Sequence, residues 1–333
     1  MELLEPALTG QLLGKPVWMW LAFLSIVLLL LVLDLGVLHR EHREIPVGES
    51  LLLSAVYIGL GLGFGAWVWW YLGAQSGMEY LTGFAVEKAL AMDNVFVIAM
   101  IFAFFAVPRQ YQYRVLFWGI LGVIVLRALM IGVGATIVSQ FSWVLYIFAL
   151  FLIATGVKMI VLAEKECDIA NNPVLRFMKR HFNVTDSHHG QAFFVKQPHP
   201  VTGKPVRYMT PLFLALVMIE VADVIFAVDS VPAIFAITTD PFIVYTSNIF
   251  AILGLRALYF ALAAMVHRFH YLKYALALVL IFIGSKIFLA DLMGLDKFPP
   301  VVALTITFGI LAGGVVYSLL RTRYEPTHGE ARL

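Results

Sequence analysis

The sequence has little charge and almost no cysteine, and each shortage excludes a class of protein. Charged residues form 13% of the 333 residues, hydrophobic residues form 61%, and the mean hydropathy is +0.89. Because a soluble domain usually carries about a quarter charged residues, this composition indicates a protein that crosses a membrane several times. The single cysteine, Cys167, excludes an internal disulfide and a paired-cysteine redox motif.

Other absences concern chemistry. The sequence has no nucleotide-binding motif, so transport driven by ATP would need another subunit. All nine histidines fall in predicted loops or at span ends, which argues against haem or quinone chemistry inside the membrane. The residues "MELLEPALTGQLLGK" lack the basic start of a cleaved signal peptide, so we expect the first apolar run to be retained. We expect no enzymatic activity, no prosthetic group and no nucleic-acid partner.

Long apolar runs fill most of the chain, and a run of about 20 residues is enough to span a bilayer. The sequence therefore predicts an all-α polytopic membrane protein, with residues 1–333 forming a single transmembrane domain within the lipid bilayer. The segments "YLGAQSGMEY" and "TTDP" have the composition of turns. The predicted spans, about nine in number, are 17–38, 50–72, 80–107, 111–138, 143–162, 209–237, 242–265, 271–291 and 299–320.

The distribution of Lys and Arg predicts the orientation of these spans. Most basic residues lie in the C-terminal tail and in the loops after the first, third, fifth and seventh spans, whereas the loops on the other side contain only Lys15 and Lys297. Cytoplasmic loops hold the positive excess, so we expect the N-terminus outside and the C-terminus in the cytoplasm. The connection 163–208 is then cytoplasmic, and "FFVKQPHPVTGKPVRYMT" within it fits either a β-hairpin or a solvated loop.

Self-similarity within the chain predicts an internal repeat. Each repeat would contain three spans, an odd number, so the second copy would start on the opposite side of the membrane. Transporters use such inverted repeats to build a binding site near the middle of the bilayer. The two predicted repeats are 80–162 and 209–291, and the matching segments are "VLRALM" (125–130) with "GLRALY" (254–259), "TGVKMI" (155–160) with "IGSKIF" (283–288), and "EKALAMDNVF" (87–96) with "DVIFAVDSVP" (223–232).

The repeats place carboxylates, amides and hydroxyls inside apolar spans, where an ionisable residue is more often functional than structural. Two helical turns take about seven residues, so Glu87 and Asn94 share one helix face, and Asp223 and Ser230 share another. By the symmetry of the repeat, Asp93 and Asp229 are predicted to be the central ligands of a cage. The complete predicted metal site consists of Asp93, Asp229, Glu87, Asp223, Glu220, Asn94 and Ser230.

Basic residues inside or beside the spans nearly balance the acids. We expect them to neutralise the empty site and to release their partners when a metal binds. The alternative is that ion pairs merely hold the spans together, with Arg127 and Arg256 as structural partners, although buried pairs often stabilise no better than apolar packing. The predicted charge-pairing or gating residues are Arg127, Arg256, Lys158, Lys286, Lys88 and Asp34.

The donor types limit the ion that such a cage would hold. Carboxylate, amide and hydroxyl oxygens suit hard divalent ions such as Mg²⁺, Ca²⁺ and Mn²⁺. Zinc, copper or nickel would be expected to use imidazole or thiolate, which the predicted spans lack. The same carboxylates can also relay protons, alone or coupled to the metal.

The segments "EKALAMDNVF", "EVADVIFAVDSVPAIFAITTDPFIVYTSNIFAILGLRALYF" and "GSKIF" resemble the TerC/Alx family of bacterial integral membrane proteins. The likeness runs from about Asp34 to the eighth predicted span. It implies a location in the bacterial inner membrane, a link to tellurium resistance or alkaline response, and export of Mn²⁺. Some family members are described as redox modulators, which the lone cysteine does not favour. The acidic positions that the family uses fall on Glu87, Asp93, Glu220, Asp223 and Asp229.

The sequence thus predicts a secondary-transporter-like protein that exports Mn²⁺, with protons as the coupling ion. Two alternatives stay open: a membrane scaffold or metal-delivery protein that docks a partner on the loop 163–208, and a proton-linked redox modulator. The sequence carries no signal for an oligomeric state.

Overall fold

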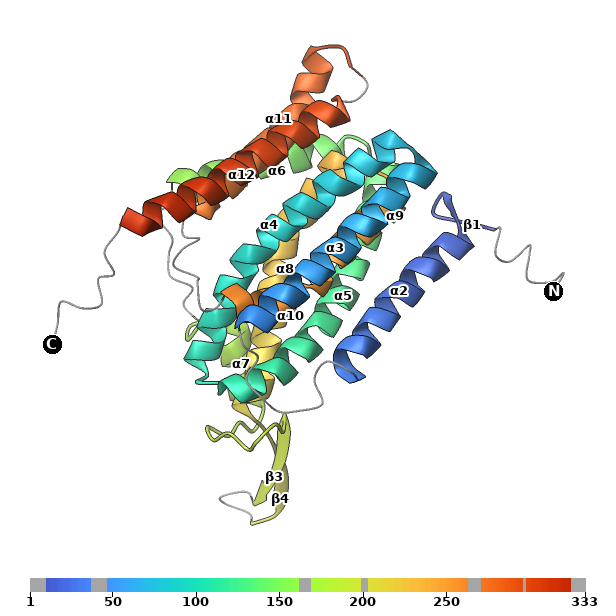
Figure 1. The fold of residues 1–333 in the computed structure, drawn as a ribbon. Coiled ribbons are helices and arrows are strands. Elements are labelled where there is room, and N and C mark those ends of the chain that lie inside the picture. Colours follow the sequence, from blue (N-terminus) through green and yellow to red (C-terminus); the bar gives the residue numbers. More distant parts are fainter. Residues whose placement is uncertain are drawn as a thin grey trace.

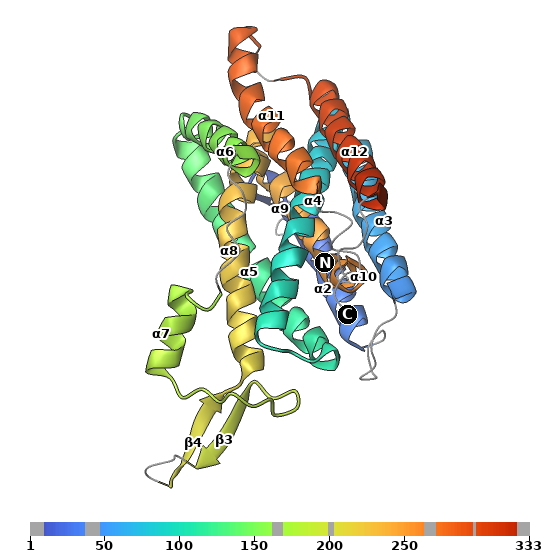
Figure 2. The ribbon, with the colours of Figure 1, turned by 90° about the vertical axis from the view of Figure 1, so that its left-hand side faces the viewer.

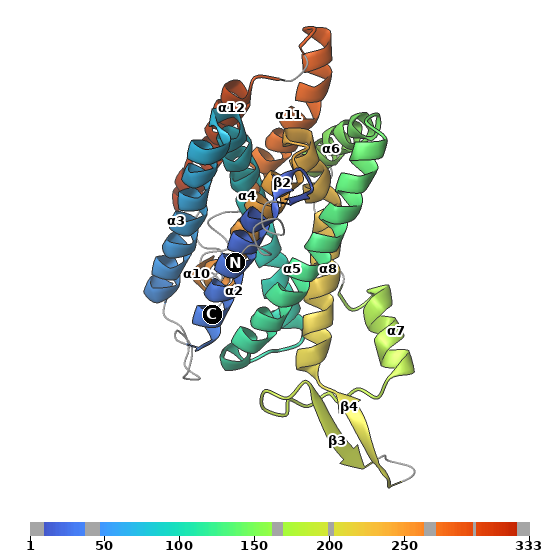
Figure 3. The same cartoon turned by 90° about the vertical axis from the view of Figure 1, so that its right-hand side faces the viewer.

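The computed structural model describes residues 10–36, 47–161, 169–198, 203–262, 271–295 and 298–324. These residues form a bundle of long helices from which a small two-stranded hairpin projects (Figure 1). We call the end of the bundle that bears the hairpin the hairpin end, and the opposite end the far end. The views in Figures 2 and 3 show the same arrangement from the two sides, with the hairpin clear of the bundle.

The long helices follow the predicted spans. Within the described residues, seven candidate spans are long and apolar enough to cross a membrane, and α9 and α10 together form one of them. The remaining long helices are α4, which carries several charged residues, and α2, whose apolar stretch Val17–Leu33 is shorter. The helices are α2 (Val17–Gly36), α3 (Val47–Leu72), α4 (Ala74–Phe104), α5 (Arg109–Gln140), α6 (Val144–Val161), α8 (Pro211–Ile237), α9 (Pro241–Leu253), α10 (Leu255–Leu262), α11 (Leu272–Leu292) and α12 (Pro300–Tyr324). An all-α polytopic membrane fold is therefore confirmed.

One local prediction fails for a backbone reason. The segment "YLGAQSGMEY" is not a long turn, because α3 continues to Leu72 and α4 starts at Ala74. Gly73 alone separates them, with a φ of +96° that glycine adopts without the strain of a side chain. The predicted span 242–265 corresponds to one candidate span, Pro241–Leu262, within which Gly254 separates α9 from α10. The "TTDP" turn is confirmed, and Asp240 caps α9 by accepting a hydrogen bond from the amide of Phe242 at 3.0 Å.

The connection between α6 and α8 carries the hairpin and a short helix. Strand β3 (Phe194–Pro198) pairs antiparallel with β4 (Pro205–Met209). Helix α7 (Pro173–His181) was not predicted; it begins after Asn172, whose side chain accepts from the amide of Val174. A second small pair, β1 (Gln11–Leu12) with β2 (Lys15–Pro16), precedes α2.

Two apolar regions hold the bundle together. Near the hairpin end, side chains from α4, α5, α8 and α10 form a large core that also covers α7. Toward the far end, aromatic rings join α2, α3 and α9, on the side that faces the viewer in Figure 3. Trp20 and Phe242 meet edge to face with ring centroids 5.2 Å apart, and Phe64 lies 4.7 Å from Phe250.

Helices α6 and α11 approach each other closely at two glycines. A Cβ atom placed on Gly156 would lie 2.6 Å from the carbonyl oxygen of Ala277, and one placed on Gly284 would lie 2.5 Å from the carbonyl oxygen of Ala149. Because both obstacles are backbone atoms, any larger residue would push the helices apart. Figure 2 shows the two helices beside each other toward the far end of the bundle.

Candidate functional site

Three helices bring charged residues together near the middle of the bundle. Glu87 lies halfway along α4, Arg127 lies on α5, and Asp223 and Ser230 lie on α8. All four side chains are buried, with exposed fractions between 1% and 5%. The seven-residue spacing on α8 places its carboxylate and its hydroxyl on one face, as the sequence predicts, and that face meets α5.

We call Glu87, Arg127, Asp223 and Ser230 the central cluster, and Arg127 donates hydrogen bonds to its other three members. Its Nη2 donates to Oδ1 of Asp223 at 2.9 Å and its Nε donates to Oδ2 of the same carboxylate at 3.2 Å. Its Nη1 donates to the hydroxyl of Ser230 at 3.0 Å and also to Oε1 of Glu87. A planar guanidinium is suited to this two-point contact with a carboxylate. The two acids that the repeat treats as equivalent are therefore bridged by one cation.

A small pocket adjoins the cluster on the hairpin side. Its surface is almost entirely apolar and comes from α4, α5, α8 and α10, with Asn94 and Asp223 as the polar residues among those that line it. Its volume of about 20 Å³ is enough for one water-sized particle. The side-chain oxygen of Asn94 is buried and has no hydrogen-bond partner among the described residues. This oxygen and the Asp223 carboxylate are the kind of ligand that a hard cation prefers.

A larger pocket, about 280 Å³, opens at the far end of the bundle. Glu79, Thr82, Thr238 and Lys286 line it, together with the exposed Asp291. Glu79 is only 8% exposed and accepts hydrogen bonds from Thr238 at 2.5 Å and from Gln75 at 3.1 Å. The central cluster thus lies between a small pocket on the hairpin side and a wider polar pocket at the far end.

Two predicted acidic ligands on α8 lie outside the central cluster. Asp229 is half-buried and accepts a hydrogen bond from Thr155 on α6 at 3.2 Å. Glu220 lies against Gly122 of α5, where a Cβ atom would overlap its carboxylate. Its Oε2 is buried and has no hydrogen-bond partner within the described residues. The side chains of the predicted residues Asp93 and Asp34 lie outside the described part of the chain.

The predicted basic residues have different surroundings. Lys88 donates to the backbone carbonyl of Ala251 at 3.0 Å. The guanidinium of Arg256 lies 4.3 Å from the centre of the Tyr113 ring. Lys286 lines the larger pocket, and Lys158 is exposed.

The sequence analysis did not identify several buried polar side chains. Asn248 on α9 is fully buried, and neither atom of its amide has a partner in the part of the chain that the structure describes. The hydroxyls of Ser50 and Ser54 on α3 are likewise buried and unpartnered there. The polar run "YTSN" (245–248) within an apolar span was the available signal for Asn248, whereas isolated serines in a helix give none.

The cluster is not a ready-made metal cage. Among the described residues, no group of three or more His, Cys, Asp and Glu side chains is arranged to hold a metal ion. Arg127 instead occupies the space between Glu87 and Asp223. What the arrangement offers is two buried carboxylates and one hydroxyl around a cation that the protein itself supplies, with the amide oxygen of Asn94 at the adjoining pocket.

Comparison with known proteins places the chain in a family. A family model described as "Integral membrane protein TerC family" matches residues 72–325. The chain is 48% identical over 302 residues to an "Uncharacterized membrane protein" of Rickettsia bellii, covering 91% of this chain and 97% of that protein. It is 44% identical over 326 residues to the "Putative membrane-bound redox modulator Alx" of Photorhabdus laumondii, covering 95% and 99%, and 45% identical over 307 residues to the protein of that name in Escherichia coli, covering 90% and 92%. No solved structure matches the chain.

Proposed function

The chain belongs to the TerC family of integral membrane proteins, and from this premise we propose that it is a secondary transporter that exports Mn²⁺ across the bacterial inner membrane. The observation that carries the proposal is the buried central cluster of Glu87, Arg127 and Asp223, with pockets on both of its sides. A cluster that served only to hold helices together would not need a pocket on each side, one of them wide and partly polar.

Charge balance suggests how the site works. In the central cluster two carboxylates share one guanidinium, so a divalent cation matches their charge better than Arg127 does. When the ion arrives, Arg127 withdraws, and the carboxylates of Glu87 and Asp223 become ligands along with the oxygens of Asn94 and Ser230. When the ion leaves, Arg127 returns and keeps the buried acids from being left unpaired, which would be strongly unfavourable.

The donor set favours Mn²⁺ over softer metals. Carboxylate, amide and hydroxyl oxygens suit hard divalent ions, and the sequence places no histidine or cysteine within the spans that carry the cluster. Asp229 and Asp93, which the repeat treats as equivalent, are proposed as further ligands on the path of the ion. Glu220, whose buried oxygen lacks a partner in the described structure, is proposed to guide the ion on the hairpin side.

The proposed transporter contains two inverted repeats, 80–162 and 209–291. The glycine contacts between α6 and α11 support this part of the proposal. Gly156 meets Ala277 and Ile281, and Gly284 meets Ala149 and Ile153. The two glycines occupy the same position in the matching segments, and the residues that they contact have the same offset along the chain, so each helix contacts the other as a two-fold relation predicts. By the excess of basic residues, the hairpin end is proposed to be cytoplasmic.

Flux into inside-out vesicles tests this proposal. Wild-type protein should take up Mn²⁺, whereas Glu87→Gln, Asp223→Asn and Asp229→Asn should each reduce uptake. Asp186→Asn is the matched control, because Asp186 is an exposed acid in the connection before the hairpin. Uptake by the wild type that survives both Glu87→Gln and Asp223→Asn would exclude the central cluster as the site.

The names of two relatives favour a second candidate, a membrane-bound redox modulator. In this chain such a role has a single thiol available, that of Cys167. A redox function predicts that Cys167→Ser removes the cellular phenotype, whereas the transport function predicts that it leaves Mn²⁺ flux unchanged. The same variant therefore separates the two candidates.

A further inference from the structure

Helix α7 lies outside the bundle but is fixed to it near the ends of the long helices. Its side chains Leu175 and Met178, one turn apart, are 1% and 6% exposed and belong to the core that joins α4, α5, α8 and α10 near the hairpin end. Figures 2 and 3 both show α7 beside the end of α8, with the hairpin reaching farther out. Because α5 and α8 are candidate spans, α7 lies where a bilayer around them would have its surface.

The outward face of α7 combines basic and aromatic side chains. Arg176 and Arg180 are exposed and four residues apart, so they lie side by side on the face away from the core. Phe177 lies next to them and is 55% exposed. Phe182 directly follows the helix, is 47% exposed, and has its ring centroid 6.5 Å from that of Phe177. Aromatic rings and basic groups that occur together on one helix are typical of a membrane surface.

The charge of α7 has one sign. Its charged residues are Arg176, Lys179 and Arg180, and the sequence has no acid between residues 173 and 185. None of the three bases pairs with a carboxylate in the part of the chain that the structure describes. Arg176 donates at 3.3 Å to the carbonyl and side-chain oxygens of Asn171. The helix dipole stabilises bases in the last turn, which accounts for Lys179 and Arg180 but not for Arg176 in the first half of the helix.

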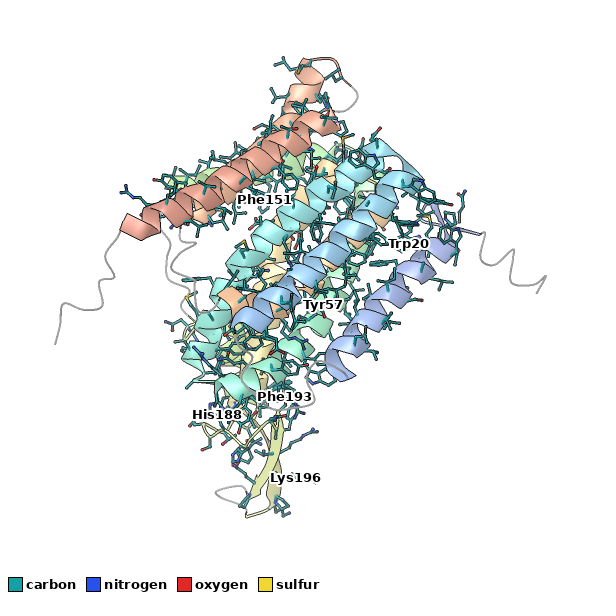
Figure 4. All side chains as sticks on the ribbon, in the orientation of Figure 1. Trp20, Tyr57, Phe151, His188, Phe193 and Lys196 are labelled. Atoms are coloured by element: carbon teal, nitrogen blue, oxygen red, sulfur yellow. The ribbon has the colours of Figure 1, made fainter. Side chains whose placement is uncertain are left out.

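The hairpin provides a contrast within the same connection. It carries three exposed basic residues, Lys196, Lys204 and Arg207. The guanidinium of Arg207 lies 4.3 Å from the centre of the Phe194 ring, so the protein itself supplies a partner for this base. Figure 4 shows Lys196 on the hairpin, beyond the end of the bundle. The hairpin therefore offers the same number of bases as α7 at a greater distance from the spans.

The position and chemistry of the outward face favour a lipid headgroup over an acidic protein. A bilayer that surrounds the spans already reaches the level of α7, and it would cover the exposed rings of Phe177 and Phe182. Lys and Arg near a membrane surface are attracted to anionic lipids. A guanidinium also donates in a planar fork that matches the oxygens of a phosphate. A docking protein would need only the charge, which the hairpin offers as well.

We propose that α7 is a binding surface for the phosphate headgroups of anionic phospholipids. Arg176 and Arg180 bind the phosphate oxygens, and Lys179 adds positive charge beside them. Phe177 and Phe182 enter the interface between the headgroups and the acyl chains. This surface anchors the connection between α6 and α8 to the bilayer, and it does so whichever ion the bundle carries.

The first test measures contact between α7 and the headgroups. The full chain with Cys167→Ser is reconstituted in vesicles of phosphatidylglycerol and phosphatidylcholine, and a fluorophore is attached at Phe177→Cys or, as the control, at Lys196→Cys. Spin-labelled headgroups should quench the fluorophore on α7 much more strongly than the one on the hairpin. Equal quenching, with both fluorophores open to iodide in the water, would place α7 away from the bilayer. Its basic face would then fit an acidic protein, and the proposal would be overturned.

The second test asks whether the charge of the headgroup matters. With the fluorophore on α7, spin-labelled phosphatidylglycerol should quench about fivefold more than spin-labelled phosphatidylcholine. Substitution of the three bases of α7 should remove this preference, whereas the matched substitution on the hairpin should leave it. Absence of the preference in the unsubstituted helix, its survival in the α7 variant, or equal loss in both variants would overturn the proposal. The two triple variants are Arg176→Gln with Lys179→Gln and Arg180→Gln, and Lys196→Gln with Lys204→Gln and Arg207→Gln.

A salt titration gives a result that does not depend on any substitution in the basic face. At about 1 M salt the Debye length falls to about 3 Å, so the preference for phosphatidylglycerol should fall toward the level of the α7 triple variant. A preference that salt does not change would contradict recognition by charge. All six substituted side chains are exposed, so both triple variants should melt at the temperature of the parent protein. None of these measurements requires Mn²⁺ transport, so their outcome is separate from that of the proposed function.

Discussion

Helix α4 holds two cations of the bundle in contrasting ways on its two faces. Arg127 is fixed by Glu87 and Asp223 in a fully buried cluster with three partners. Lys88 is held by one backbone carbonyl at a helix break. Removal of the first cation leaves two buried carboxylates unpaired, whereas removal of the second leaves one backbone carbonyl without this donor. The difference supports the proposal that the transported metal replaces Arg127 at the central cluster.

The largest expected effect is that of removing the guanidinium. Arg127→Ala leaves two buried carboxylates without a cation, and breaking a buried pair in this way costs about 3–5 kcal/mol. We expect a clear fall in expression level and in the melting temperature of the purified protein. The triple variant with Glu87→Gln and Asp223→Asn should recover most of the loss, because the unpaired charges are then removed. Failure of this rescue would contradict the charge argument.

Next in size is the effect of filling the glycine contacts between α6 and α11. Gly156→Leu and Gly284→Leu should destabilise the protein by similar amounts, about 1–3 kcal/mol each, because overpacking forces backbones apart. Gly309→Leu on α12 is the control, since nothing lies within 4 Å of a Cβ atom there. Thermal unfolding in detergent measures all three. A large difference between Gly156→Leu and Gly284→Leu would argue against the proposed two-fold relation.

Removal of the ammonium group should disturb the fold less than removal of the guanidinium. Lys88→Met loses one charge-assisted hydrogen bond, about 1.5–3 kcal/mol, and part of this is offset because a charge no longer has to be buried. The melting temperature should therefore fall by less than it does in Arg127→Ala. An equal or larger fall in the melting temperature of Lys88→Met would contradict the proposed difference between the two faces of α4.

The smallest effect is expected at Asp229. Thr155→Val removes a single hydrogen bond to its half-buried carboxylate, worth about 0.5–1.5 kcal/mol. Stability should therefore change little, while the rate of Mn²⁺ uptake should change if Asp229 lies on the path of the ion. Unchanged uptake would limit the transport site to the central cluster.

Much of the fold follows from the sequence because apolar runs and charge distribution fix membrane helices strongly. The shared faces of Glu87 with Asn94 and of Asp223 with Ser230 follow from helix periodicity alone. The end of α3 and the start of α4 did not follow, because a single glycine at Gly73 separates two helices where composition suggests a longer turn.

The partners of the charged side chains were harder to predict. The repeat makes Asp93 and Asp229 equivalent, yet the structure gathers Glu87 and Asp223 around Arg127 and directs Asp229 to Thr155. Which of two neighbouring acids faces a given helix depends on a rotation of a few tens of degrees. The close packing of Lys88 and Tyr57 against Gly254 likewise involves residues of other helices, which local sequence patterns cannot identify.

The central claim is that the buried pair of Glu87 and Asp223 binds the transported ion in place of Arg127. The most direct test is Mn²⁺ uptake into inside-out vesicles by the wild type, Glu87→Gln, Asp223→Asn and the control Asp186→Asn. We predict uptake by the wild type and the control, and its loss in both cluster variants. Equal uptake by all four proteins would contradict the claim.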